Sequence, residues 1–98
     1  MMKMSDLAKQ ILIHYGLRHQ KSKAIEELAE LIVALQKDLL VEKEGLSREV
    51  KEEIADVHIM LMQLLDDESD KVEVSCIVHK KLKRQIRRIK REIKQNDR

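Results

Sequence analysis

Three observations on the sequence predict an all-α fold, a four-helix antiparallel bundle. The 98 residues are enough for one domain with one modest core, which we expect to span residues 1–98. The apolar residues are almost entirely Leu, Ile, Val, Met and Ala, with no Phe, Trp or Pro, and Leu, Met and Ala favour helices. Two glycines and the acidic segment "DDESD" at residues 66–70 provide few breaks.

The first two helices are expected on either side of Gly16. One helix should run from about Ser5, a good N-cap residue, to Tyr15 and end at Gly16. A second, from about Lys21 to Glu42, has apolar residues at alternating steps of three and four, which predicts one buried stripe. The residues of this stripe are Ile25, Leu28, Ile32, Leu35 and Leu39.

The third and fourth helices are expected after Gly45. Ser47 should cap a helix from about Arg48 to Leu65, which lies antiparallel to the second helix because the link between them is short. The last helix should span about residues 72–94, and residues 95–98 should fray. The inner stripes are Val50, Ile54, Val57, Leu61 and Leu64 on the third helix, and Leu82, Ile86, Ile89 and Ile93 on the fourth.

Cysteine content and the absence of long apolar segments indicate the cellular compartment. The single cysteine, Cys76, allows no intrachain disulfide and fits a reducing compartment, where we expect it to be a small core residue. No apolar run approaches the roughly 20 residues needed to cross a bilayer. The N-terminal segment "MMKMSDLAKQ" lacks the apolar centre of a secretory signal. We therefore expect a cytoplasmic protein with no membrane partner.

Charge is distributed unevenly along the chain. Residues 22–70 include 14 acidic and 5 basic residues, whereas residues 79–94 include 9 basic and 1 acidic residue. Such asymmetry indicates either two poles of one site or a basic tail that binds a polyanion.

Four of the acidic residues fall in otherwise apolar helices. Glu27 and Glu30 lie in "AIEELAELIVAL", and Glu53 and Asp56 lie in "VKEEIADVHIML". At about 100° per residue, each pair occupies one flank of its helix's apolar stripe. Antiparallel pairing would let the flanks face each other and gather four carboxylates at one partly buried place. Their repulsion and desolvation would cost several kcal/mol unless a cation or protons compensate.

The chemistry of these donors indicates which cation would fit. All four are hard oxygen donors, which suit Mg²⁺ or Mn²⁺ and disfavour zinc. The Glu-x-x-His pattern of di-iron bundles is absent. Because carboxylate-held Mg²⁺ commonly binds substrate phosphates, phosphate chemistry is the leading interpretation. The alternative is that these acids are two solvated faces that hold no metal.

The same residues resemble a known family. The sequence has two acidic motifs separated by 22 residues, Glu26-Glu27-Leu28-Ala29-Glu30 and Glu53-Ile54-Ala55-Asp56. This pattern is similar to the Glu-Glu-x-x-Glu and Glu-x-x-Asp motif of the MazG-like all-α nucleoside triphosphate pyrophosphohydrolases, particularly their short phage and bacterial members. The flanking segments "HYGLRHQKSKAIEEL" and "VHIMLMQL" add to the resemblance, which extends from about Tyr15 to Arg88.

This resemblance implies an activity and a set of site residues. The activity is hydrolysis of a (d)NTP to the (d)NMP and pyrophosphate by attack of metal-activated water. The cofactor would be Mg²⁺, with Mn²⁺ as the alternative. Glu26 would be a catalytic helper base or a partner of the ligands. Phosphate binding would fall first to Lys81, and then to Arg84 and Arg88. The implied metal ligands are Glu27, Glu30, Glu53 and Asp56.

Base binding and assembly complete the expectations. Tyr15 is the only aromatic ring available for stacking, with His19 and Gln20 close by and His14 as a lesser candidate. The alternative for Tyr15 is a packing role with its hydroxyl in water. Apolar residues outside the stripes would be exposed in a monomer, so we expect a homodimer or a dimer of dimers. These residues are Val33, Leu40, Ile59 and Met62.

Two other functional classes stay open. A helical nucleic-acid-binding or regulatory module would use the basic segment "KKLKRQIRRIKR" on phosphates. That interpretation gives the inward-facing acids no purpose, and they would repel the same polyanion. A catalytically silent helical oligomer is the other alternative, although an intact set of ligands argues against it.

Overall fold

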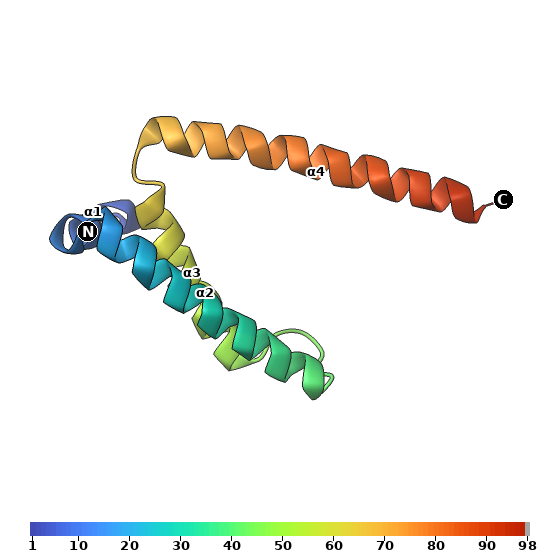
Figure 1. Ribbon diagram of the computed structural model, residues 1–98, viewed down its shortest axis with the longest axis horizontal. Helices are drawn as coiled ribbons and strands as arrows, with labels where there is room; N and C mark the ends of the chain where they lie inside the picture. The colour runs from blue at the N-terminus through green and yellow to red at the C-terminus, as the bar shows by residue number, and fades with distance from the viewer. Residues whose placement is uncertain (98) are drawn as a thin grey trace. The chain divides into compact units, whose positions relative to one another are not determined.

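A computed structural model describes residues 1–97, which form four helices and no strands (Figure 1), so the all-α prediction is confirmed. The chain divides into two compact units. The first, Met1–Asp66, contains α1 (Met4–Tyr15), α2 (Leu17–Leu40) and α3 (Arg48–Leu64), and the second begins at Asp67 and contains α4 (Glu68–Asn96). One domain over residues 1–98, with α4 packed in an antiparallel bundle, stays a prediction.

A single glycine separates α1 from α2. Gly16 has φ +87°, a left-handed conformation that favours glycine, and its N–H donates to Leu12 O at 2.7 Å. This one residue completes the turn, so α2 begins at Leu17 and not at the expected Lys21. The expected cap at Ser5 is also wrong, because α1 begins at Met4 with Lys3 at its N-cap position.

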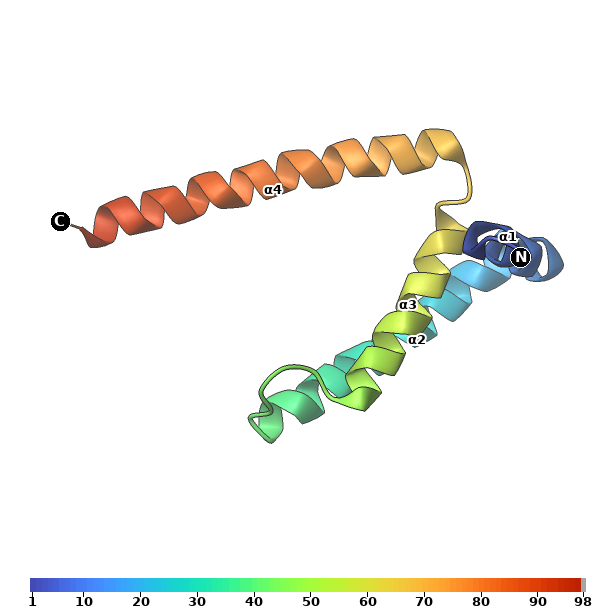
Figure 2. The same ribbon diagram turned by 180° about the vertical axis from the view of Figure 1, so that it is seen from behind.

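Helices α2 and α3 form an antiparallel hairpin, side by side in both views (Figures 1 and 2), and α1 packs against both. The loop is fixed at Ser47, whose N–H donates to Asp38 Oδ2 at 2.9 Å and whose Oγ accepts from Val50 N–H at 3.1 Å. The predicted Ser47 cap is therefore confirmed. Hydrogen bonding from the Ser47 backbone N–H is the main cause of the lowered pKa of the Asp38 carboxyl, and the Ser47 side chain lowers it further. The bond between Asp38 and Ser47 also ties the end of α2 to the start of α3.

The interface within the hairpin includes two buried alanines. Ala24 and Ala34 of α2 are buried against the face of α3 that carries Val50, Val57 and Met60. Three polar side chains are buried at the same interface, and they are Gln20, Glu27 and Gln63.

The predicted apolar stripe of α2 does not form this interface. Its five side chains are 40% to 78% exposed, and on α3 Ile54 and Leu61 are also exposed, whereas Val50 and Val57 are buried as expected. The expectation of a buried stripe on α2 is thus wrong for the single chain. The alanine face packs against α3, and the large apolar residues form a second surface beside it.

The second unit is one long amphipathic helix. Asp67 Oδ2 accepts from Asp70 N–H at 3.1 Å, so the segment expected to be a turn caps α4 and forms its first turn. Acidic residues in this first turn interact favourably with the helix dipole. The helix continues to Asn96, beyond the expected end, and Arg98 of the expected frayed end lies outside the described residues. No described residue of α4 is buried, and Cys76, expected in a core, is exposed.

Within residues 1–97, no helix combines the length and the apolar composition that crossing a membrane requires.

Candidate metal centre and adjoining pocket

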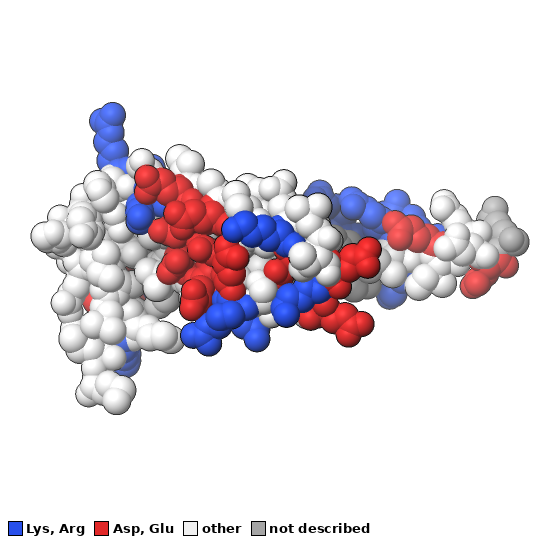
Figure 3. Space-filling view, turned by 90° about the horizontal axis from the view of Figure 1, so that it is seen from below, with Lys and Arg blue, Asp and Glu red and all other residues white. Residues whose placement is uncertain are grey.

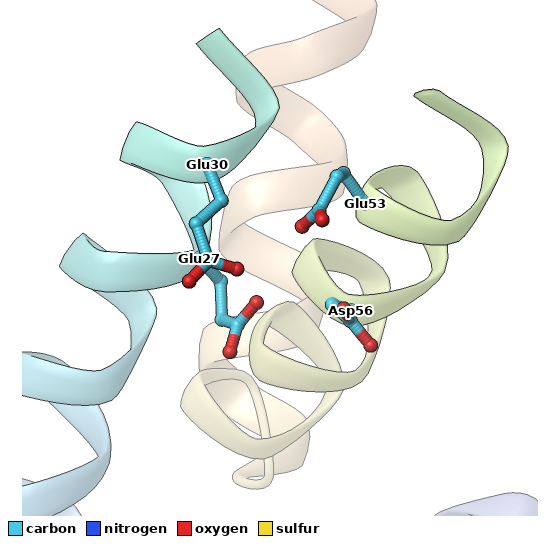
Figure 4. Close-up of side chains that lie close together, drawn as sticks. All are labelled: Glu27, Glu30, Glu53 and Asp56. Carbon is cyan, nitrogen blue, oxygen red and sulfur yellow. The ribbon is translucent and has the colours of Figure 1, made fainter. Parts of the chain in front are cut away.

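The α2–α3 hairpin brings together the four acids that the sequence singles out. Each residue offers one carboxylate oxygen, and these oxygens all lie within 4.8 Å of one another. The α2 side chains face those of α3 across the gap between the helices (Figure 4). The members of this carboxylate cluster are Glu27, Glu30, Glu53 and Asp56.

Local structure explains the convergence. Within each pair the residues are three apart, so they lie one turn from each other on the same side of a helix. The cluster is partly buried, since Glu27 is 7% exposed and Glu53 is half-buried, whereas Glu30 and Asp56 are exposed. Acidic side chains gather into one patch over the hairpin (Figure 3). The cluster is therefore rooted between the helices and open to solvent on one side.

The electrostatics of the cluster are unbalanced. Glu27 Oε2 and Glu53 Oε2 are buried atoms with no hydrogen-bond partner among the described residues. An unpaired buried carboxylate oxygen is unfavourable. Desolvation raises the pKa of Glu53, and the neighbouring negative charges of Glu30 and Asp56 raise it further. The arrangement calls for a proton or a cation.

The residues fit a hard divalent cation. Two oxygens on opposite sides of a Mg²⁺ ion lie about 4.2 Å apart, because each Mg–O distance is about 2.1 Å. Oxygens within 4.8 Å of one another can reach one such ion after small side-chain rotations, or bridge two ions about 3.5–4 Å apart. The described cluster contains no His or Cys, so its chemistry favours Mg²⁺ or Mn²⁺ over zinc.

A lysine that sequence reasoning missed lies beside the cluster. Lys23 Nζ is 3.3 Å from Glu27 Oε1 and 3.5 Å from Glu26 Oε2. The bond to Glu27 is the main cause of the raised pKa of Lys23, and the charge of Glu26 adds to it. The sequence does carry a signal for this ion pair, because Lys23 and Glu27 have i,i+4 spacing on one helix. Glu26, expected to be catalytic, pairs with Lys23 and lies outside the cluster, with 64% of its side chain exposed.

A pocket of about 540 Å³ adjoins the cluster and shares Glu27 and Asp56 with it. The three residues expected to bind a base, Tyr15, His19 and Gln20, all line this pocket. The Tyr15 and His19 rings are stacked, with centroids 4.8 Å apart and planes 15° apart. The structure thus places the expected base-binding residues and two carboxylates of the cluster around one cavity.

The pocket also includes Gln63, which sequence reasoning missed. Gln63 is 2% exposed, and its Oε1 accepts from Gln20 Nε2 at 2.7 Å. The available signal was spacing, since Gln63 follows Asp56 by seven residues, about two turns along the same face.

The residues expected to bind phosphate lie elsewhere in the chain. Lys81, Arg84 and Arg88 are exposed residues of α4, in the second compact unit. The carboxylate cluster and the pocket belong entirely to the first unit. Participation of these cations in the site stays a prediction.

The raised pKa of Glu53 gives a testable pH dependence for the metal-free protein. The folded state holds this proton above the ordinary glutamate pKa of 4.5, so it binds more protons than the unfolded state does. Stability from this group should therefore be present at low pH and be lost as pH rises through the raised pKa. Tm measured in EDTA between about pH 5 and about pH 8 should fall more in wild type than in Glu53→Gln.

At neutral pH, Mg²⁺ should stabilise wild type and have little effect on Glu53→Gln. At about 100 times its Kd, Mg²⁺ should raise the wild-type Tm by about 10 °C and leave that of Glu53→Gln nearly unchanged. Glu52→Gln is the control, because its exposed neighbouring carboxylate pairs with Arg48. An equal Mg²⁺ response in Glu53→Gln and wild type would contradict the site.

Comparison with known proteins gives no match to any family model, any curated protein or any solved structure. The case for a function therefore depends on this chain's own residues. The two central features are the carboxylate cluster and the adjoining pocket. Together they could hold a dication next to an organic ligand of nucleoside size.

Proposed function

We propose that this protein is a Mg²⁺-dependent nucleoside triphosphate pyrophosphohydrolase that converts a (d)NTP to the (d)NMP and pyrophosphate. The observation that carries the proposal is the convergence of four carboxylates within 4.8 Å beside a pocket of about 540 Å³. The order of the same acids in the sequence, which resembles the MazG-like motif, also supports it. The four cluster residues would hold the metal.

The chain's own residues account for the other requirements of the reaction. Bound Mg²⁺ would neutralise phosphate oxygens and lower the pKa of an attacking water. Lys23, 3.3 Å from Glu27 and part of the pocket lining, would be a candidate to bind a phosphate oxygen of the substrate. Glu26 also lines the pocket, and as an exposed carboxylate it is a candidate proton acceptor.

The other residues that line the pocket suit a base. Tyr15 and His19 stack on each other and offer an aromatic surface and a ring edge, and Ile11, Ile59 and Met60 add apolar lining. A nucleoside held by these groups would direct its phosphates toward Glu27 and Asp56 of the same pocket. Orientation of this kind brings the reacting groups together before the chemical step.

We also propose that the protein is a homo-oligomer, a homodimer or a dimer of dimers. The support is the apolar surface that the single chain leaves exposed. Ile25, Ile32 and Leu39 on α2 are 69%, 57% and 78% exposed, and on α4 Leu82 and Ile86 are about half exposed. Apolar surfaces of this extent mark interaction sites. In such an assembly Lys81, Arg84 and Arg88 would stabilise the departing pyrophosphate.

The direct experiment is a substrate screen with the full-length protein. Canonical and damaged (d)NTPs are incubated with Mg²⁺ or Mn²⁺, and pyrophosphate and monophosphate products are quantified. At least one nucleotide should yield equimolar (d)NMP and pyrophosphate, and EDTA should stop the reaction. Release of inorganic phosphate with (d)NDP, or no hydrolysis across the panel, would refute the proposal.

One observation favours a second candidate, a nucleic-acid-binding module. The 9 basic residues between positions 79 and 94 lie on α4, where no described residue is buried. That function predicts salt-sensitive retention on DNA or RNA, lost when Arg87, Arg88 and Arg91 are changed to Gln and kept in Asp56→Asn. Retention that is insensitive to both salt and these arginines would exclude it.

A further inference from the structure

A hydrogen-bonded chain of three polar side chains, two of them buried, runs from Gln63 of α3 through Gln20 to the exposed His19 at the pocket. Gln20 and Gln63 are 3% and 2% exposed. Gln20 Nε2 donates to Gln63 Oε1 at 2.7 Å, and Gln20 Oε1 lies 2.7 Å from His19 Nδ1. Burying two amides in so small a core is unfavourable unless their polar atoms are paired. The pairing therefore fixes both amides in place.

The direction of this chain is set by a backbone carbonyl. An amide can turn over and exchange its oxygen and nitrogen, so only a neighbour of fixed polarity defines its orientation. Gln63 Nε2 lies 3.4 Å from Ile59 O and 4.0 Å from Met60 Sδ, and both of these atoms accept. Gln63 Oε1 must then face Gln20. Gln20 in turn donates through Nε2 and presents Oε1 to His19.

The consequence falls on the tautomer of His19. Because Gln20 Oε1 only accepts, the proton of the neutral imidazole must be on Nδ1, which leaves Nε2 as an unprotonated acceptor. No described residue hydrogen-bonds Nε2. Stacking on Tyr15, with the rings 15° from parallel, fixes the plane of the ring that carries this acceptor.

We propose that the Gln63–Gln20–His19 chain makes His19 Nε2 a specificity-determining acceptor for an N–H at the edge of the bound base. Gln20 and Gln63 are positioning residues that act through His19. Each canonical base carries a ring N–H or an amino group, so the ligand class is a nucleotide with an unmodified base, and a base whose donor is methylated is rejected. The identity of the ligand rests on the proposed function, whereas the tautomer does not.

The tautomer is tested by long-range ¹H–¹⁵N spectra of the full-length labelled protein at about pH 8, where imidazole is neutral. His19, assigned from the spectrum of His19→Gln, should show a protonated Nδ1. His14, His58 and His79 are exposed internal references that should favour the Nε2–H form, the preferred tautomer of a solvent-exposed histidine side chain. A predominantly Nε2–H form at His19 would overturn the proposal.

The role of Gln63 is tested with a matched pair of variants. Gln63→Met keeps the length of the side chain but removes the amide, so His19 should shift toward the Nε2–H form. Gln36→Met makes the same change at an exposed position of α2 and should leave His19 unchanged. If His19 stays Nδ1-protonated in Gln63→Met, with the fold retained by circular dichroism, the chain does not set the tautomer.

Ligand preference is tested with nucleosides, which need neither metal nor catalysis. Uridine and adenosine are titrated against 3-methyluridine and N6,N6-dimethyladenosine while the His19 ring signals are followed. Loss of one hydrogen bond should weaken binding by about tenfold in wild type and much less in Gln63→Met. Equal affinities within each pair, or no binding by any of the four, would overturn the specificity role.

Failure here is distinguishable from failure of the proposed function. Hydrolysis of a (d)NTP by a protein whose neutral His19 is protonated at Nε2 would refute only the inference about His19. An Nδ1-protonated His19 and the expected nucleoside preference, without any pyrophosphate release, would refute only the enzymatic proposal.

Discussion

Replacing Asp56 by Asn is expected to lower kcat/KM for nucleoside triphosphate hydrolysis by about a thousandfold, equivalent to about 4 kcal/mol of transition-state stabilisation. The substitution keeps the shape of the side chain and removes the charge that an oxygen ligand supplies to a hard cation. Glu53→Gln should act alike, since Glu53 lies in the same cluster. The measurement is pyrophosphate release under subsaturating substrate, with circular dichroism to show that the helices are retained.

Two controls make this experiment specific. Glu52→Gln removes a charge from the residue next to Glu53, but Glu52 is exposed and pairs with Arg48 outside the cluster, so activity should stay within about twofold of wild type. Raising the Mg²⁺ concentration should recover part of the activity of Asp56→Asn if the loss is one of metal affinity. Full activity in both Asp56→Asn and Glu53→Gln would show that the cluster is not the metal centre.

Replacing Ile32 by Lys is expected to dissociate the protein into single chains. Ile32 is 57% exposed in the single chain, where such a surface change should alter stability by no more than about 0.5 kcal/mol. In an assembled interface, by contrast, it would bury a lysine charge without a partner, at a cost of several kcal/mol. Size-exclusion chromatography with light scattering should therefore show a multiple of the chain mass for wild type and one chain mass for Ile32→Lys.

The matched control is Ile32→Leu, which keeps the apolar area and should keep the assembly. A wild-type protein that is already a single chain at all concentrations would contradict the proposed oligomer. Equal masses for wild type and Ile32→Lys would mean that the exposed stripe of α2 is not the interface.

The sequence predicted the parts of the fold that depend on local signals. Ser47 was recognisable as a cap, and its Oγ accepts the Val50 N–H as expected. The pairing of Glu27 and Glu30 with Glu53 and Asp56 was also predictable, because i,i+3 spacing and an antiparallel hairpin leave few other arrangements. These features depend on residues near in sequence, or on one short loop.

The sequence did not predict which face of α2 packs inside the hairpin. Large apolar residues at three- and four-residue steps indicated the stripe that contains Ile32, yet Ala24 and Ala34 lie at the interface. Hydrophobic periodicity finds the most apolar face of a helix, but it cannot tell an intrachain contact from one made with another chain. Gln63 was missed for a similar reason, since its partner Gln20 is 43 residues away and only the fold brings the two side chains together. Lys23, by contrast, was missed although its partners lie within four residues of it.

The alanine face of the hairpin has a further consequence for ion selectivity. Ala24 and Ala34 are buried and lie on either side of Glu27 and Glu30 along α2. A larger side chain at either position would push α2 away from α3 and lengthen the span between opposing carboxylates. If the cluster holds Mg²⁺, such a change should shift its preference toward the larger Ca²⁺, although neither alanine belongs to the cluster.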